Sequence, residues 1–582
     1  MTSDAGGEHL TEAGVVAPGR SRGRAWSEVA TLAGFCAYLF FYGLGSFGLV
    51  GADEPRYAQI AREMLARHDW ITPMLNGVPW LEKPALYYWS AIFSFKLFGV
   101  SDWAARVPSA AFATAMVAVI YGYMRRFRDS ALDAALIAAS FAAVIGFGRG
   151  ASTDMPLAAT MTIGMLAWFA WWETGHRLWL AGFYAMIALG TLAKGPVAPA
   201  LSGATIVLFA FLCGRSWPEH ASETRATGFR LIAKTLWIPG VLLFFAIALP
   251  WYFAVQRTTH QFFQVFILQH NLERFGTNLY RHQQPYWYYL PVFLLGVLPW
   301  TVCVIAAIVN ALRQLRRGAY PELVTTSAAR DPGFHSTGRE RAWRVFLLLW
   351  IAVPLAVFTI SRSKLPGYIL PSIPPSALLV ADWLRARSQE RASAWLLAAH
   401  SVICGLLLGG TLLAPYFIVR THPPALAITI AGIAAAVIAF AMVLTLRWQV
   451  LRVLRFVTLV PVVLGLAFVL RLSAPLVDRT QSSRPVAEEL ARLGASGPQL
   501  AAFNITRETE YGLDFYRNQP VKRYERGEVP AADHLLIARS GSEPQLDAFL
   551  AGRRLSHVGS FAAQKLEIYW VSAGTVHHHH DE

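Results

Sequence analysis

The chain has 582 residues, of which 55% are hydrophobic and only 15% are charged, a composition typical of a protein that crosses a membrane several times rather than of a soluble enzyme. Its formal net charge of +15 would suit a nucleic-acid-binding protein. The basic residues cluster in short segments between apolar runs, however, so we expect no nucleic-acid partner.

After a polar tail of residues 1–27, the sequence contains about thirteen apolar runs that approach the roughly 20 residues needed to span a bilayer. They lie near 28–50, 104–124, 131–149, 153–172, 177–193, 196–213, 235–254, 290–311, 344–361, 369–385, 393–416, 424–446 and 453–472. The sequence therefore predicts a polytopic α-helical membrane protein in which residues 28–472 form the membrane domain and 1–27 a cytoplasmic tail.

The loops between these runs predict an orientation, because Lys and Arg in short loops mark the cytoplasmic side. Five basic clusters fall on the same side as residues 1–27: Arg125/Arg126/Arg128, Arg215/Arg225/Arg230, Arg313/Arg316/Arg317, Arg385/Arg387/Arg391 and Arg447/Arg452/Arg455. Loops 51–103, 255–289 and 361–371 are then external.

Residues 85–100 are apolar but short, aromatic and interrupted by Lys96, so we interpret them as a helix lying in the membrane interface. Counting them as a span would move every later basic loop to the outside.

Residues 473–582 change in character and are predicted to be external. The segments 501–505, 534–538 and 566–573 resemble short strands, and 484–493 an amphipathic helix, which predicts a small soluble α/β domain.

The first external loop begins with an acidic pair, Asp53 and Glu54, followed by Arg56 and Tyr57. Ionisable residues at the end of a span are costly and therefore suggest function. Other polar side chains gather in the external loops as well: Glu82 and Lys83, Arg149 and Asp154, His270 and Arg274, and Arg362, Lys364 and Tyr368. Carboxylates can act as bases or bind sugar, and the cations can hold a phosphate leaving group.

Each candidate also has a purely structural interpretation. Asp53, Glu54 and Asp154 are residue types that begin helices, and Asp154 could be an N-cap. Lys364 could extend to the membrane interface, and Glu82 and Lys83 could form a surface ion pair. Glu82 and His270 could bind a metal, although they lack a compact ligand motif.

Five segments resemble the bacterial lipid A aminoarabinose transferase family, which has the GT-C glycosyltransferase fold and is related to the protein O-mannosyltransferases. They are DEPRYAQIAREML, WLEKPALYYW, STDMPLA, HNLERFGTNLYRHQQPYWYYLP and SRSKLPGYILP. The resemblance implies catalytic roles for Asp53 and Asp154, with Glu54 beside them. It also implies that Lys83 and Tyr368 bind the carrier phosphate. A departing phosphate needs positive charge beside it, which makes Arg56 and Lys364 further candidates, and Tyr57 and Arg274 complete the predicted substrate-binding residues. Glu82 and His270 match positions that can hold a divalent metal, with zinc as the candidate. The resemblance does not imply that a cofactor is required.

The resemblance further implies an enzyme of the bacterial inner membrane, monomeric and surrounded by lipid, with its active site facing the periplasm. It would transfer 4-amino-4-deoxy-L-arabinose from undecaprenyl phosphate to a lipid A phosphate. Alternatives are a relative that uses another polyprenyl-phosphate sugar, such as a hexose or uronic acid, a relative with a protein hydroxyl acceptor, or a lipid or sugar transporter.

Overall fold

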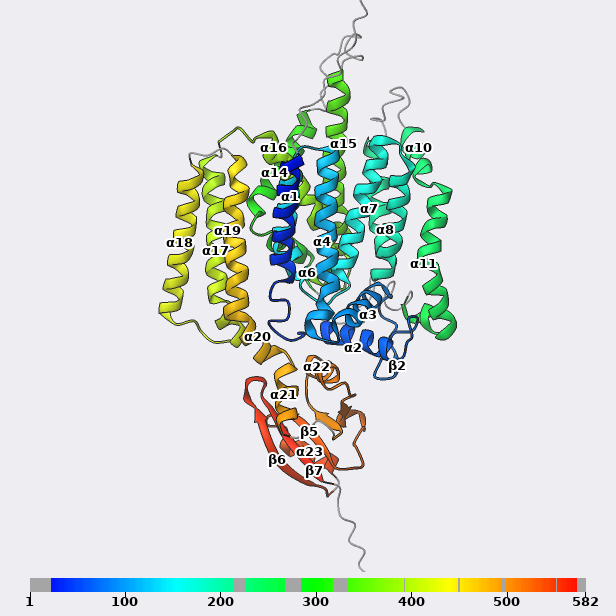
Figure 1. The fold of residues 1–582 in the computed structure, drawn as a ribbon, viewed down its shortest axis with the longest axis vertical. Helices are drawn as coiled ribbons and strands as arrows, with labels where there is room; N and C mark the ends of the chain where they lie inside the picture. Colours follow the sequence, from blue (N-terminus) through cyan, green and yellow to red (C-terminus); the bar gives the residue numbers. More distant parts are fainter. Residues whose placement is uncertain are drawn as a thin grey trace, which may run out of the picture.

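The computed structural model describes residues 22–213, 226–266, 284–317, 332–391, 393–447, 451–493, 498–550 and 552–572. Most of them form an upright helical bundle with a small domain below it (Figure 1). The bundle consists of α1 (Arg22–Cys36) with η1 (Ala37–Phe41), α4 (Asp102–Phe127), α5 (Ala131–Ser140), α6 (Ala142–Gly148), α7 (Asp154–Thr174), α8 (Arg177–Lys194), α9 (Val197–Cys213), α10 (Ala226–Thr235), α11 (Ile238–Thr258), η4 (Tyr286–Tyr288), α13 (Tyr289–Gly296), α14 (Thr301–Arg317), α15 (Pro332–Ile360), η6 (Pro366–Ser372), α16 (Ile373–Ala386), α17 (Ala394–Val419), α18 (Ala425–Leu446), η7 (Leu451–Val453), α19 (Leu454–Phe468), η8 (Val469–Ser473) and α20 (Ala474–Gln481).

The structure supports a polytopic helical membrane protein, but with fewer full spans than the thirteen predicted. Among the described residues, seven helices are long and apolar enough to cross a membrane, or nine if each of two bent helix pairs counts as one span. Every predicted run does contain a helix. Four of the runs form helices that are too short or not apolar enough for a full span: α1 with η1, α8, α9 and α16.

Breaks within the apolar runs explain part of this difference. The run at 131–149 bends by 66° between α5 and α6, and the run at 290–311 bends by 111° between α13 and α14, where Pro299 interrupts the helix. In the run at 369–385, Pro371, Pro374 and Pro375 follow one another closely, and the chain begins as the 3₁₀ turn η6 before α16 starts. Apolar composition predicts burial in lipid but not where a helix breaks, and prolines mark the breaks in the runs 290–311 and 369–385.

The first predicted external loop forms a platform across one end of the bundle. It contains α2 (Asp53–Ala66) and α3 (Leu86–Phe98), which lie between the bundle and the small domain (Figure 1). The two helices are joined through a hairpin of β1 (Met74–Leu75) and β2 (Val78–Pro79). Its turn residues, Asn76 and Gly77, have φ angles of 54° and 78°, as an Asn-Gly hairpin turn requires.

The C-terminal part folds into a sheet flanked by helices. Its described elements are α21 (Arg484–Arg492), β3 (Leu500–Phe503), α22 (Arg507–Arg517), β4 (Lys522–Arg523), η9 (Tyr524–Arg526), β5 (His534–Arg539), α23 (Glu543–Leu550), β6 (Arg554–Phe561), η10 (Ala562–Gln564) and β7 (Leu566–Ser572). In this part of the chain the sheet has the order β4-β3-β5-β7-β6, with β3 parallel to β4 and β5, and β7 antiparallel to β5 and β6.

Two apolar clusters cover the two faces of this sheet. α21 and α22 pack on one face through Val486, Leu490 and Leu513, and α23 packs on the other through Leu546 and Leu550. Strand β5 is buried along Leu535–Ala538, which matches its continuous apolar sequence. The arrangement is that of a small α/β domain attached to the bundle through α19, η8 and α20.

The basic clusters lie at the end of the bundle away from this domain. The C-terminal ends of α4, α14 and α16 are all at that end (Figure 1). Ion pairs also join two of the clusters to acidic partners there, Arg128 with Glu173 and Arg385 with Asp129. Arg215 and Arg225 lie outside the described residues.

Candidate active site

The two carboxylates of the acidic pair have different surroundings. The side chain of Glu54 is 13% exposed and forms a bidentate ion pair with Arg106, whose Nε and Nη2 donate at 3.0 and 2.6 Å. Glu54 also accepts hydrogen bonds from the backbone N–H groups of Val50 and Ala151 at 2.9 and 2.7 Å. This geometry assigns Glu54 to structure, because its carboxylate joins α2, α4 and the turn before α7.

Asp53 is the more available carboxylate, since its side chain is 60% exposed. It pairs one helical turn along α2 with Arg56 at 2.5 Å. The guanidinium of Arg56 is enclosed by aromatic rings, with its central carbon 5.2 Å from Tyr57, 4.9 Å from Trp80 and 5.6 Å from Tyr511. Cation–π contacts of this kind hold a guanidinium in place without using up its hydrogen-bond donors.

Three buried polar atoms near this enclosure have no hydrogen-bond partner among the described residues: Arg56 Nε, Trp80 Nε1 and Tyr88 Oη. Burial lowers the pKa of Arg56, but the neighbouring Tyr57, Asp53 and Glu82 raise it by more than burial lowers it. The pKa is therefore above its ordinary value, and the guanidinium stays charged. Burial likewise raises the pKa of Tyr88, so its hydroxyl remains a donor. Unpaired buried donors are rare and costly, so these atoms indicate a place for an anionic ligand.

A second ion pair lies at the start of α7. Asp154 is the first residue of this helix, but it makes no N-cap hydrogen bond, so the capping interpretation is wrong. Its carboxylate instead pairs with Lys194, the last residue of α8. A cation suits that position because a helix C-terminus carries partial negative charge.

The 361–371 loop covers this second pair. The ring of Tyr368 lies 4.7 Å from Lys194 Nζ, and a Cβ atom on Gly367 would come within 2.7 Å of the Asp154 carboxylate. The backbone at 367 can approach Asp154 this closely only because it has no side chain. Lys364 does not extend to the membrane interface, because it is buried and its ammonium donates to the carbonyl of Ser361 at 2.6 Å.

Tyr57 links the two ion pairs. Its ring is buried and packs against Tyr87 and Tyr88. Burial is the largest cause of its raised pKa, and the negative charges of Asp53 and Asp154 both raise it further. The carboxylates at the starts of α2 and α7 therefore both act electrostatically on the same phenol.

The structure also describes Glu82 and Lys83, which follow the Asn76–Gly77 hairpin and are both half-buried. Glu82 acts electrostatically on Arg56. Arg274 and His270 lie outside the described residues. In the described part of the chain, no three His, Cys, Asp or Glu side chains lie together as metal ligands, and the zinc site with Glu82 and His270 stays a prediction.

An apolar cavity of about 420 Å³ lies next to Glu54. Side chains of α6, α17 and α19 line it, among them Ile145, Leu407 and Val462, and its lining also includes Glu54. Its chemistry suits a hydrocarbon chain.

Lys194, Arg106, Trp80 and Tyr511 were not predicted as site residues. The sequence does mark Lys194 and Arg106 as unusual, because each is a cation within or next to an apolar run, where an unpaired charge is costly. Tyr511 is not marked in this way, because no local pattern places residue 511 beside residue 56. Arg149, predicted among the polar residues of this face, donates to the carbonyls of Leu39, Tyr42 and Gly43 and so holds the end of η1.

Membrane proteins that transfer lipid-linked sugars are among the proteins to which this chain is similar. The model of the family "Dolichyl-phosphate-mannose-protein mannosyltransferase" matches residues 27–266. The fold is that of ArnT from Cupriavidus metallidurans, crystallised with undecaprenyl phosphate, with a TM-score of 0.71, 22% identity, and coverage of 94% of this chain and 98% of that one. The apo structure of the same protein matches with the same TM-score and 21% identity.

More specifically, the chain is similar to the undecaprenyl phosphate-alpha-4-amino-4-deoxy-L-arabinose arabinosyl transferases of Yersinia. The Yersinia enterocolitica protein is 31% identical over 365 residues, which cover 61% of this chain and 59% of that protein. The Yersinia pestis protein is 30% identical over the same length. The match thus spans about three fifths of the length of these relatives. The family resemblance predicted from the motifs is confirmed.

Proposed function

We propose that this protein transfers 4-amino-4-deoxy-L-arabinose from undecaprenyl phosphate to a phosphate of lipid A. The observation that carries the proposal is the enclosed Arg56 with unpaired donors beside it, in a chain similar to aminoarabinose transferases. Such a group of donors suits the phosphate of a polyprenyl carrier. The neighbouring apolar cavity suits a lipid chain.

In this reaction an acceptor phosphate oxygen attacks the anomeric carbon of the sugar. The bond from that carbon to the donor phosphate oxygen breaks, and undecaprenyl phosphate leaves with the electron pair. Arg56, together with Lys83, would stabilise the negative charge that develops on the leaving phosphate. The acceptor is already anionic at neutral pH, so no strong general base is needed.

The carboxylates have a matching role. Asp53 and Asp154 can bind the cationic 4-amino group or stabilise positive charge at the anomeric carbon. Both are paired with cations that a substrate could share, Arg56 and Lys194. Glu54 is outside this scheme, because Arg106 and two backbone N–H groups occupy its oxygens.

Mass spectrometry of lipid A tests the proposal. Cells that express the chain should carry lipid A heavier by one aminoarabinose residue, and cells without the gene or with Asp53→Asn should not. The family match over residues 27–266 favours one second candidate, transfer of a lipid-linked sugar to a protein hydroxyl. Unmodified lipid A together with a newly glycosylated envelope protein would select that alternative.

We also propose that the platform and the α/β domain face the periplasm of a bacterium, with the protein acting as a monomer in the inner membrane. The basic clusters at the opposite end of the bundle support this orientation. A cysteine at the exposed Val78 should react with an impermeant thiol reagent in intact cells, and one at the exposed Gln389 should not. The four native cysteines are buried, which keeps the background low. Labelling at residue 389 alone would reverse the orientation.

A further inference from the structure

Helix α22 of the C-terminal domain lies directly against α2 of the platform. Its residues Tyr511, Asp514 and Phe515 are spaced i, i+3 and i+4, so they share one face of the helix. That face meets α2, where the backbone carbonyl of Phe515 accepts a hydrogen bond from Arg62 at 2.8 Å. Phe515 also belongs to the same apolar cluster as Tyr57.

One wall of the enclosure around Arg56 therefore comes from a distant part of the chain. Tyr57 and Trp80 belong to the platform, whereas Tyr511 belongs to the C-terminal domain and places its ring 5.6 Å from the guanidinium carbon. The Arg56 side chain is only 11% exposed. Without the Tyr511 ring the guanidinium would lose one of the three surfaces that restrict its movement.

The same helix also holds the hairpin that precedes Trp80. Asp514 accepts a hydrogen bond from Asn76 Nδ2 at 2.8 Å, and Glu63 of α2 accepts from the backbone N–H groups of Asn76 and Gly77 at 2.8 and 3.3 Å. The hairpin is thus fixed from both helices, and the chain leaves it toward Trp80, Glu82 and Lys83.

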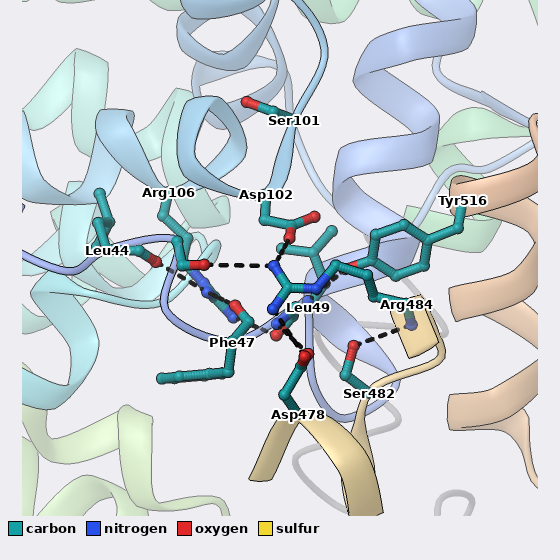
Figure 2. A network of polar contacts seen from close by, with 12 residues as sticks. Leu44, Phe47, Leu49, Ser101, Asp102, Arg106, Asp478, Ser482, Arg484 and Tyr516 are labelled. Carbon is teal, nitrogen blue, oxygen red and sulfur yellow. Dashed lines mark hydrogen bonds and ion pairs between the residues drawn. The ribbon is translucent and has the colours of Figure 1, made fainter. Parts of the chain in front are cut away.

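A separate polar network joins the C-terminal domain to the start of α4, to α20 and to the segment before α2 (Figure 2). Arg484 pairs with Asp102 at the start of α4 and with Asp478 of α20, each at 2.7 Å. The Tyr516 hydroxyl accepts a hydrogen bond from the backbone N–H of Leu49 at 2.7 Å. These contacts connect α21 to α4 and α20, and α22 to the segment that leads into α2.

We propose that Tyr511 is a positioning residue of the active site, through which the C-terminal domain holds Arg56 ready for the donor phosphate. The inference rests on the proposed function, because it assigns the donor phosphate to Arg56. Tyr511 itself touches no substrate in this scheme. Its ring restricts the guanidinium and leaves the unpaired Nε available for the ligand.

The test compares three variants of the full-length protein in detergent. Tyr511→Phe keeps the ring, Tyr511→Leu replaces it with a smaller aliphatic side chain, and Phe549→Leu makes the matched change at a ring that packs on Phe503 and Tyr524 elsewhere in the same domain. The readouts are the apparent melting temperature, binding of undecaprenyl phosphate, and KM for the sugar donor and for lipid A.

Tyr511→Leu should weaken undecaprenyl phosphate binding and raise the donor KM by about two- to thirtyfold, the range of a cation–π contact, with the KM for lipid A unchanged. Tyr511→Phe should bind undecaprenyl phosphate as tightly as the unmodified protein and have the same donor KM. Undecaprenyl phosphate binding by Tyr511→Leu equal to that of the unmodified protein would overturn the inference, and so would an equal loss in Phe549→Leu. If the unmodified protein binds undecaprenyl phosphate but transfers no sugar, the proposed function fails while the inference is still decided by binding. Absence of binding in the unmodified protein would overturn both.

Discussion

Replacing Glu54 by Gln should lower the stability of the folded protein, whereas Asp53→Asn should leave the stability unchanged. Glu54 accepts four hydrogen bonds, two of them from Arg106, whose side chain is 1% exposed. An amide has only one acceptor oxygen, so Glu54→Gln leaves the buried guanidinium of Arg106 without its counter-charge. Breaking a buried pair from one side costs about 3–5 kcal/mol.

The apparent melting temperature of the purified variant, measured by fluorescence-detected size exclusion, reports this loss. The double variant Glu54→Gln with Arg106→Met should recover part of the stability, because the unpaired buried charge is gone. Arg106 also donates to the carbonyls of Leu44, Phe47 and Gly48, so the recovery will be incomplete. A Glu54→Gln protein that melts normally but fails to transfer sugar would refute the structural assignment and return Glu54 to the catalytic group.

Three further predictions concern the site and its support. Asp53→Asn should melt normally, because the side chain is 60% exposed, and should transfer sugar to lipid A about a hundredfold more slowly in a purified assay. Gly367→Ala should also reduce transfer, because the new Cβ would lie 2.7 Å from the Asp154 carboxylate, whereas Gly410→Ala, with nothing within 4 Å, is the control. Burial raises the pKa of Asp514 from 3.8 to about 7, so the folded state holds this proton more tightly than the unfolded state. The free energy of unfolding should therefore fall by about 3 kcal/mol between pH 4 and pH 7. Asp514→Asn should remove this dependence, measured as the melting temperature against pH.

Periodic and compositional signals predict the elements well where they depend on local sequence. The segments expected as strands at 501–505, 534–538 and 566–573 correspond to β3, β5 and β7, and the predicted helix at 484–493 corresponds to α21. The segment 85–100, which was predicted to lie in the membrane interface, contains α3, and this helix lies across the end of the bundle (Figure 1). The predicted thirteen spans are not confirmed, because at most nine among the described residues are long and apolar enough to cross a membrane, and hydropathy alone does not register a bend such as the one between α5 and α6.

The sequence predicted that several polar residues of the external loops lie near one another, but not which of them form ion pairs, and their roles stay predictions. Asp53, Arg56, Tyr57 and Asp154 were expected on one face, and the structure brings them together. The partners that separate Glu54 from Asp53 could not be read from the sequence, because Arg106 lies 52 residues further on. Tyr511 depends on the docking of a whole domain, which no periodicity in either segment specifies.

The pairing itself narrows the choice of donor sugar. Each half of the site combines a cation with a carboxylate, Arg56 with Asp53 and Lys194 with Asp154. A donor with one phosphate and one ammonium group can engage a cation and a carboxylate at once, so that each charge keeps a partner of opposite sign. A uronic acid would bring two negative groups and place one of them against the carboxylates, which like-charge repulsion disfavours. A neutral hexose would leave the carboxylates with only hydroxyl partners. The arrangement of charges therefore supports the amino sugar in the proposed reaction rather than a hexose or a uronic acid.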